Sequence, residues 1–165
     1  MSVTTGSAVV TLPAENQILI TREFDAPAPL VWRAMTEPDL IRRWWHANRG
    51  EVLSCEVDLR VGGRWRYVSR THEGFEFAFH GEYREIVPGE RIVTTEAYEG
   101  IPDADANAAV NTVTLEEREG RTVMTVLVEH PTREGRDAHV GSGMEAGMQT
   151  AYDLLEEVAV SLRPR

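Results

Sequence analysis

A stretch near the end of the chain, residues 142–162, constrains the fold more than any other. Its apolar residues recur at helical spacing and share one face, namely Met144, Met148, Ala151, Tyr152, Leu155, Val158, Ala159 and Leu162. Ser142 and Glu145 form an S-x-x-E pattern, which predicts a capping box at the helix start. An apolar stripe of this length has to be buried, and the rest of the chain offers mainly strands. We therefore expect one long helix lying across one sheet.

The segments before this helix follow a simple order. Residues 17–25 predict a first strand, and the proline-rich residues 26–29 open a helix that is followed by a second short helix. Tight turns and one longer acidic loop, residues 100–109, then separate six further strands, at residues 52–60, 64–70, 75–87, 91–99, 110–117 and 122–130. Turns this short require antiparallel neighbours. The expected class is α+β, with a seven-stranded curved antiparallel sheet wrapped around the C-terminal helix.

Composition bounds the domain organisation and excludes several functions. The 165 residues predict one domain at 17–163, preceded by residues 1–16 as a flexible tail or an extra edge strand. The net charge is −10 and no lysine is present, which argues against nucleic acid, an anionic membrane and lysine-based chemistry. The single cysteine, Cys55, excludes an internal disulfide and fits the cytoplasm. We expect no secretory signal and no membrane-spanning segment.

Six sequence motifs occur in the order found in one known superfamily. They are RxFxAP at 22–27, VWRAMTxP at 31–38, the Trp44-Trp45 pair, DLRVGGRWRY at 58–67, GEYREIVPGERIV at 81–93 and SGMEAGM at 142–148. The chain resembles the START-like superfamily, also called the helix-grip or SRPBCC fold. The nearest branch is similar to the single-domain bacterial homologues of activators of the Hsp90 ATPase. This resemblance implies a ligand cavity between the sheet and the long helix.

Aromatic and methionine side chains are the candidates for lining that cavity. Alternation places Trp65 and Tyr67 on one face of their strand, and Phe75, Phe77, Phe79 and Tyr83 on one face of the next. The predicted ligand-binding residues are Trp32, Trp44, Trp45, Trp65, Tyr67, Phe77, Phe79, Tyr83, Met144, Met148 and Tyr152. The alternative is that these side chains fill the core. Gly143 and Gly147 leave the same choice open, between close packing and room for a ligand.

The polar residues form no catalytic motif. The five histidines have no metal-ligand spacing, so we expect no catalytic residues, no metal and no cofactor. His80 with Glu82, and Asp137 with His139, are read either as acid/base pairs or as solvated surface groups. Arg22 and Arg66 would anchor a carboxylate or phenolate of a ligand if they pointed inward. Alternation places Arg66 opposite Trp65, which argues against an inward position for that arginine.

Three functions follow from these expectations. The first is binding of a small hydrophobic molecule, aromatic, lipid-like or polyketide-like. The second is an enzyme similar to polyketide cyclases or dehydratases, which requires a polar group with a shifted pKa inside the cavity. The third is a co-chaperone of a heat-shock chaperone ATPase, which ranks last because eukaryotic activators carry an additional N-terminal domain that 16 residues do not supply. A homodimer, the commonest assembly, is left open.

Overall fold

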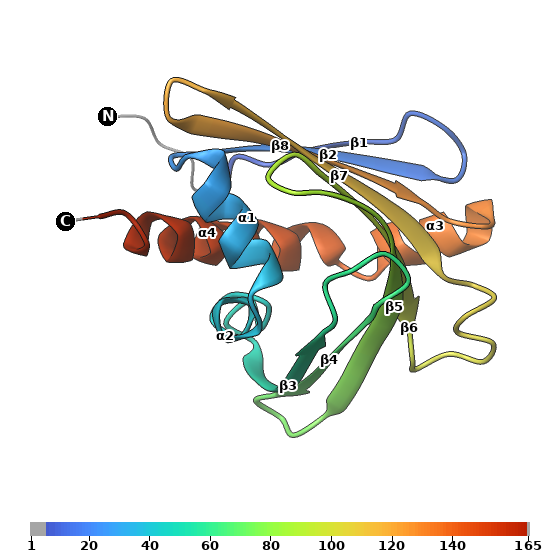
Figure 1. Cartoon of the computed structure of the whole chain (residues 1–165). Helices are drawn as coiled ribbons and strands as arrows, with labels where there is room; N and C mark the ends of the chain where they lie inside the picture. Colours follow the sequence, from blue (N-terminus) through green and yellow to red (C-terminus); the bar gives the residue numbers. More distant parts are fainter. Residues whose placement is uncertain (1–5, 165) are drawn as a thin grey trace.

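The computed structural model describes residues 6–164 and consists of one curved sheet that wraps around one long helix (Figure 1). The strands are β1 (Val9–Thr11), β2 (Gln17–Phe24), β3 (Gly50–Val57), β4 (Arg64–Thr71), β5 (Glu76–Val87), β6 (Arg91–Tyr98), β7 (Ala109–Arg118) and β8 (Arg121–Glu129). The helices are α1 (Ala28–Thr36), α2 (Pro38–Ile41), α3 (Arg133–Gly141) and α4 (Met144–Ser161). The α+β helix-grip architecture expected from the sequence is confirmed.

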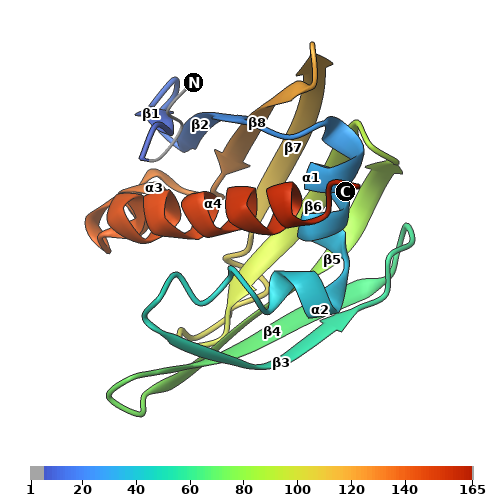
Figure 2. The same ribbon diagram turned by 90° about the vertical axis from the view of Figure 1, so that its left-hand side faces the viewer.

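The sheet has eight strands rather than the seven expected. Their order is β1-β2-β8-β7-β6-β5-β4-β3, and all pairs are antiparallel. The additional strand is β1, which pairs with β2 at one edge, so this part of residues 1–16 is a strand. Residues 1–5 of the expected tail lie outside the described residues. The sheet is twisted and curls around α4. In the view turned by 90°, β1 and β2 lie on one side of α4, and β3 and β4 lie on the other side (Figure 2).

Register decides which side chains face the helix. Ile18, Ile20 and Arg22 of β2 pair with Val128, Val126 and Met124 of β8, and all six side chains are buried. On the other half of the sheet, Trp65 and Tyr67 of β4 lie opposite Gly81 and Phe79 of β5. Alternation of buried and exposed residues along these strands therefore separates a concave inner face from a polar outer face.

The start of the long helix differs from the expectation. The predicted capping box is wrong: Gly143 occupies the N-cap position with a left-handed φ of 80°, and no side chain caps the helix. Ser142 instead ends α3, with its hydroxyl donating to the carbonyl of His139 at 2.6 Å. Thr132 caps α3 by accepting a hydrogen bond from the Gly135 amide. A glycine in the left-handed region lets the chain change direction between two helices without steric cost.

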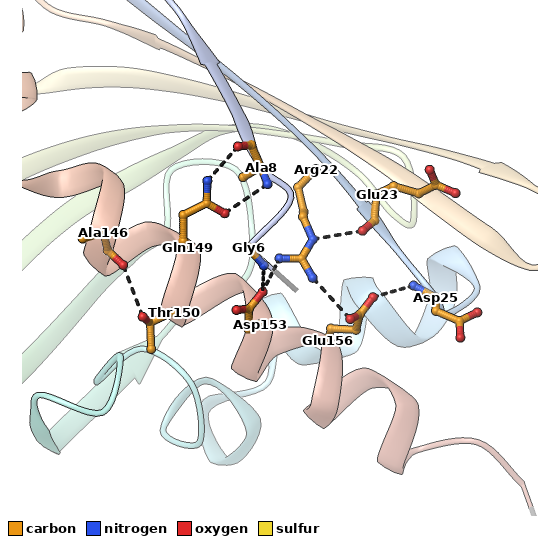
Figure 3. Close-up of polar contacts among 10 residues, drawn as sticks. All are labelled: Gly6, Ala8, Arg22, Glu23, Asp25, Ala146, Gln149, Thr150, Asp153 and Glu156. Atoms are coloured by element: carbon orange, nitrogen blue, oxygen red, sulfur yellow. Dashed lines mark hydrogen bonds and ion pairs between the residues drawn. The ribbon is translucent and has the colours of Figure 1, made fainter. Parts of the chain in front are cut away.

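A buried arginine fastens α4 to the sheet (Figure 3). The guanidinium of Arg22 donates to Asp153 at 2.7 Å and to Glu156 at 3.2 Å, and its side chain is fully buried. The Arg22 Nε–H donates to the carbonyl of Glu23, and the guanidinium carbon lies 5.0 Å from the Phe24 ring centre. The carboxylates also accept backbone N–H groups, from Gly6 on Asp153 and from Asp25 on Glu156. This network holds the orientation of α4.

The N-terminal segment lies against the same helix. The side chain of Gln149 accepts from the amide of Ala8 at 3.0 Å and donates to its carbonyl at 2.7 Å (Figure 3). Towards the C-terminal end of α4, α1 packs against this helix (Figure 1 and Figure 2). Among the helices of residues 6–164, none is long and apolar enough to cross a membrane.

Candidate functional site

Aromatic side chains from β4, β5 and the segment after α2 meet on the concave face of the sheet. Trp45 packs edge-on against Tyr67 and Phe79, with ring centres 4.9 and 6.0 Å apart. Tyr67 also contacts Trp65 at 4.7 Å, and Phe79 contacts Phe77 at 6.1 Å. Cross-strand pairing of Tyr67 with Phe79 places these rings side by side. The structure thus brings together five of the residues predicted from sequence.

The helix side of this space is built from Met144, Met148 and Tyr152 of α4. All three pack against the core but keep part of their surface accessible. The Tyr152 ring also meets Phe24 edge-on at 6.2 Å, at the closed end where α1 covers the helix. Methionines are flexible and polarisable, so this side of the space adapts to different shapes.

The other predicted aromatic residues are placed as follows. Trp44 is buried and its indole N–H donates to the carbonyl of Ala34 at 2.8 Å, which is a structural role. Trp32 is half-buried on α1 and packs against the same core. Tyr83 is buried beside Tyr67 on the inner face. Of the tryptophan pair, Trp44 therefore enters the core while Trp45 covers the sheet.

Polar groups that the sequence reasoning missed also face inward. Glu96 of β6 and Asn111 of β7 lie on the inner face, with Glu96 close enough to raise the pKa values of Tyr67 and Tyr152. Burial raises the pKa of the Glu96 carboxyl, and the Asn111 amide, which can donate a hydrogen bond to it, acts in the opposite direction. The signal was present: alternation along 91–98 places Glu96 on the same face as buried Ile92 and Thr94.

Glu96 is desolvated and yet partly accessible. Burial desolvates the carboxyl and raises its pKa, yet part of the residue's surface stays accessible to solvent. The same combination holds for Tyr152, whose pKa is also raised mainly by burial. Glu96 and Tyr152 are therefore largely desolvated groups that keep part of their surface accessible.

The remaining inner groups are neutral near pH 7. Burial raises the pKa of Tyr83 to about 12 and that of the Cys55 thiol to about 11. Burial also raises the pKa of Tyr67 well above its usual value. Cys55 pairs across strands with Tyr67, so its thiol belongs to this cluster as an unreactive group. Glu96 is the inner carboxyl of this cluster that can change charge in the accessible pH range.

A hollow of about 20 Å³ lies between residues 46–51 and strands β4 and β5, lined by Arg49, Ser69 and Phe77 among others, and it has room for about one water molecule. Gly147 of α4 faces the guanidinium of Arg49, and a methyl group at that position would lie 3.2 Å from its Nη1 atom. Gly147 is thus packed against the flexible end of the Arg49 side chain. Gly143, with its positive φ, is explained by backbone conformation.

The outer face carries a separate ionic network. Arg66 forms a bidentate ion pair with Glu99, at 2.9 Å for both bonds, and His80 contacts Glu99 and Asp105. The Arg66 hydrogen bonds lower the pKa of Glu99 to about 2, and the Asp105 contact raises the pKa of His80. A groove of about 280 Å³ beside Arg66 and Phe75 opens on this side. Arg66 is thus no anchor for an internal ligand.

The other polar candidates lie apart from the aromatic space. His139 pairs with His130 at 3.0 Å, and Asp137 forms an ion pair with Arg136, so the two do not form an acid/base pair. Burial lowers the pKa of His139 to about 4. Arg22 points inward, but its guanidinium is already bound to Asp153 and Glu156. Within residues 6–164, no group of three or more histidine, cysteine, aspartate or glutamate residues could hold a metal ion.

Comparison with known proteins agrees with this architecture. The family model described as Activator of Hsp90 ATPase homolog 1-like protein matches residues 25–159. A crystal structure of a protein from Rhodobacter sphaeroides is similar, with 26% identity, a TM-score of 0.86 and coverage of 94% of this chain and 100% of that chain. A protein from Nitrosomonas europaea has 28% identity, a TM-score of 0.80 and coverage of 91% and 97%.

A third similar structure, from Arthrobacter aurescens, has 25% identity, a TM-score of 0.82 and coverage of 93% of this chain and 91% of that chain. The comparison with curated proteins found no match. Because the family model spans most of the sequence and the helix-grip architecture is present, the resemblance seen in the motifs is confirmed. The chain belongs to the family of Activator of Hsp90 ATPase homolog 1-like proteins, in the START-like superfamily.

Proposed function

We propose that the chain binds a small hydrophobic molecule between the concave face of the sheet and α4. The observation that carries this proposal is the aromatic wall of Trp45, Tyr67 and Phe79, which faces accessible methionines on the helix. Large apolar side chains that keep accessible surface inside a fold are typical of ligand sites. A flat aromatic or polyketide-like molecule fits such walls best, because rings stack on rings at low cost in side-chain entropy.

Trp45 is the gate in this proposal. Trp45 packs against Tyr67 and Phe79, so it occupies the ring surfaces that a ligand would contact. Trp45 precedes Ala47 and Asn48, which have φ angles of 51° and 58°. Non-glycine residues in the left-handed region store strain, and a segment under strain can release it by moving. Ligand entry therefore moves this segment, and the ligand replaces the ring contacts of Trp45.

A thermal-shift screen with hydrophobic compounds tests the proposal. A ligand that binds only the folded protein raises the melting temperature. Met148→Trp fills the space between helix and sheet and is expected to abolish the shift. The matched control is Val160→Trp, which adds the same ring to an exposed position on α4 and should leave binding intact. If no compound raises the melting temperature, or if both variants behave alike, the proposal is wrong.

One observation favours a second function, an enzyme similar to polyketide cyclases or dehydratases. Glu96 is an inward carboxyl whose pKa burial raises, and carboxyls with a raised pKa are common general acids and bases in enzymes. In an enzyme, Glu96→Gln would retain ligand binding but lose turnover. Incubation of an identified ligand with the protein, followed by mass spectrometry, distinguishes this enzyme from a binding protein.

A further inference from the structure

The structure assigns the ligand a chemical class: we propose that the space under α4 takes a hydrophobic amine, held as an ammonium ion by Glu96 and Asn111. This inference rests on the proposed function and specifies the polar end of its ligand. Glu96 extends from the centre of the inner face, close to Tyr67 of β4 and Tyr152 of α4. The carboxyl therefore lies near aromatic side chains of both the sheet and the helix.

The Glu96 carboxyl lacks a counter-charge. In the described part of the chain, no arginine or histidine forms an ion pair with the Glu96 carboxyl or lowers its pKa. The group that lowers its pKa is the Asn111 amide, through a hydrogen bond. The nearby inward arginine, Arg22, is bound to Asp153 and Glu156. Burying a carboxyl without a cation or enough hydrogen-bond donors is unfavourable. A cationic ligand supplies the missing charge.

Asn111 adds a second acceptor beside this carboxyl. Its Oδ1 atom is buried and has no hydrogen-bond partner among the residues that the structure describes. A buried acceptor without a donor costs stability. A primary ammonium group has three N–H donors and can bond to the Glu96 carboxylate and to Asn111 Oδ1 together. A ligand carboxylate has no N–H or O–H to donate and would repel ionised Glu96.

The surrounding rings favour the same charge. Trp45, Tyr67, Phe79 and Tyr152 present aromatic surfaces around the space. The face of an aromatic ring attracts a cation, and this attraction is stronger when the pair is desolvated. The net charge of −10 further raises the local concentration of cations near the protein. Body and head group of the ligand are thus recognised by neighbouring parts of one site.

Three probes with one carbon skeleton test the assignment: 2-phenylethylamine, 2-phenylethanol and phenylacetate. Titration calorimetry at pH 7.5 is expected to give about tenfold tighter binding of the amine than of the alcohol, from the aromatic and carboxylate contacts. Phenylacetate is expected to bind more weakly than both. These measurements use the natural chain, so they do not depend on whether a variant folds.

Two variants locate the selectivity. Glu96→Gln keeps the shape of the side chain and removes its charge, so the preference for the amine over the alcohol should disappear. Glu76→Gln removes one charge from the exposed outer face of the sheet and should leave the preference unchanged. Because both variants change the net charge equally, a general electrostatic attraction would affect them alike.

A pH series adds an independent reading. The groups that face Glu96 are Tyr67 from β4, Asn111 from β7 and Tyr152 from α4, and none of them changes charge below pH 8. The amine stays protonated there, since its pKa is about 10, like that of lysine. Its affinity should therefore fall as Glu96 is protonated on acidification, whereas the affinity of the alcohol should stay constant.

The outcomes separate this inference from the proposed function. If the alcohol or phenylacetate binds as tightly as the amine, the assignment to amines is wrong, while binding of a hydrophobic molecule remains supported. If Glu96→Gln keeps the full preference for the amine, Glu96 is not the recognising group and the inference also falls. If none of the three probes binds at millimolar concentration, the amine site is refuted, and the wider compound screen decides on the proposed function.

Discussion

Replacement of Arg22 by methionine tests whether one buried cation holds the helix on the sheet. The substitution keeps most of the apolar volume but leaves the carboxylates of Asp153 and Glu156 without their cation. Their side chains are 25% and 14% exposed, and each retains one backbone N–H donor. Breaking a buried ion pair costs about 3 to 5 kcal/mol, and the remaining donors place this case near the lower value.

The measurement is urea unfolding monitored by circular dichroism. A loss of about 3 kcal/mol corresponds to a melting temperature lower by roughly 6 to 12 °C for a chain of this size. The matched control is Arg33→Met, which removes an exposed pair with Glu37 at 47% and 46% exposure and should leave the free energy of unfolding almost unchanged. Arg22→Met combined with Asp153→Asn and Glu156→Gln should recover much of the stability. A loss below about 1 kcal/mol for Arg22→Met alone, comparable with that of the control, would refute the reasoning.

Three further predictions concern titration and glycine. Burial raises the pKa of Glu96, so its ionised form opposes folding. Glu96→Gln should therefore raise the melting temperature at pH 8 and have no such effect near pH 4. Thermal denaturation at both pH values measures this difference. Burial lowers the pKa of His139 to about 4, so the folded form is stabilised above pH 6.5 and loses up to about 3 kcal/mol as pH falls towards 4. His139→Gln should flatten this part of the pH–stability curve, and an unchanged curve would contradict the assignment. Gly147→Ala should stabilise the folded protein by up to about 1 kcal/mol, because only a flexible arginine has to move. Gly143→Ala should destabilise it by about 1 kcal/mol, because alanine is strained at a positive φ. Equal effects of the two variants in urea unfolding would exclude these explanations.

The predictions on Arg22 and Glu96 concern different halves of the inner face. Arg22 lies on β2 with two carboxylates from α4, and this half is closed by ion pairs and by Phe24. Glu96 lies on β6 among aromatic side chains that keep accessible surface. The same concave face therefore combines an ion-paired attachment of the helix with a region whose aromatic side chains keep accessible surface.

Local periodicity in the sequence determined the elements and the faces they bury. The 3.6-residue spacing along 144–162 predicted the long helix, and strict alternation placed Trp65, Tyr67 and Phe79 on one inner surface. These predictions succeed because the helical turn and the strand pleat are properties of the backbone itself. The helix-grip fold was predicted differently, by the resemblance of the six motifs to the START-like superfamily.

Only the tertiary structure decided which groups meet. The sequence pattern at Ser142 fits a helix cap, yet packing of α3 against β2 and the His130–His139 contact place that serine at the end of another helix. Arg22 was an open candidate for ligand binding until α4 brought two carboxylates to it. Glu96 and Asn111 are neighbours because of the register in which β6 and β7 pair, and no local pattern specifies that register. Contacts between distant segments depend on strand order and register, and these are set by the global burial of apolar surface rather than by any single stretch of residues.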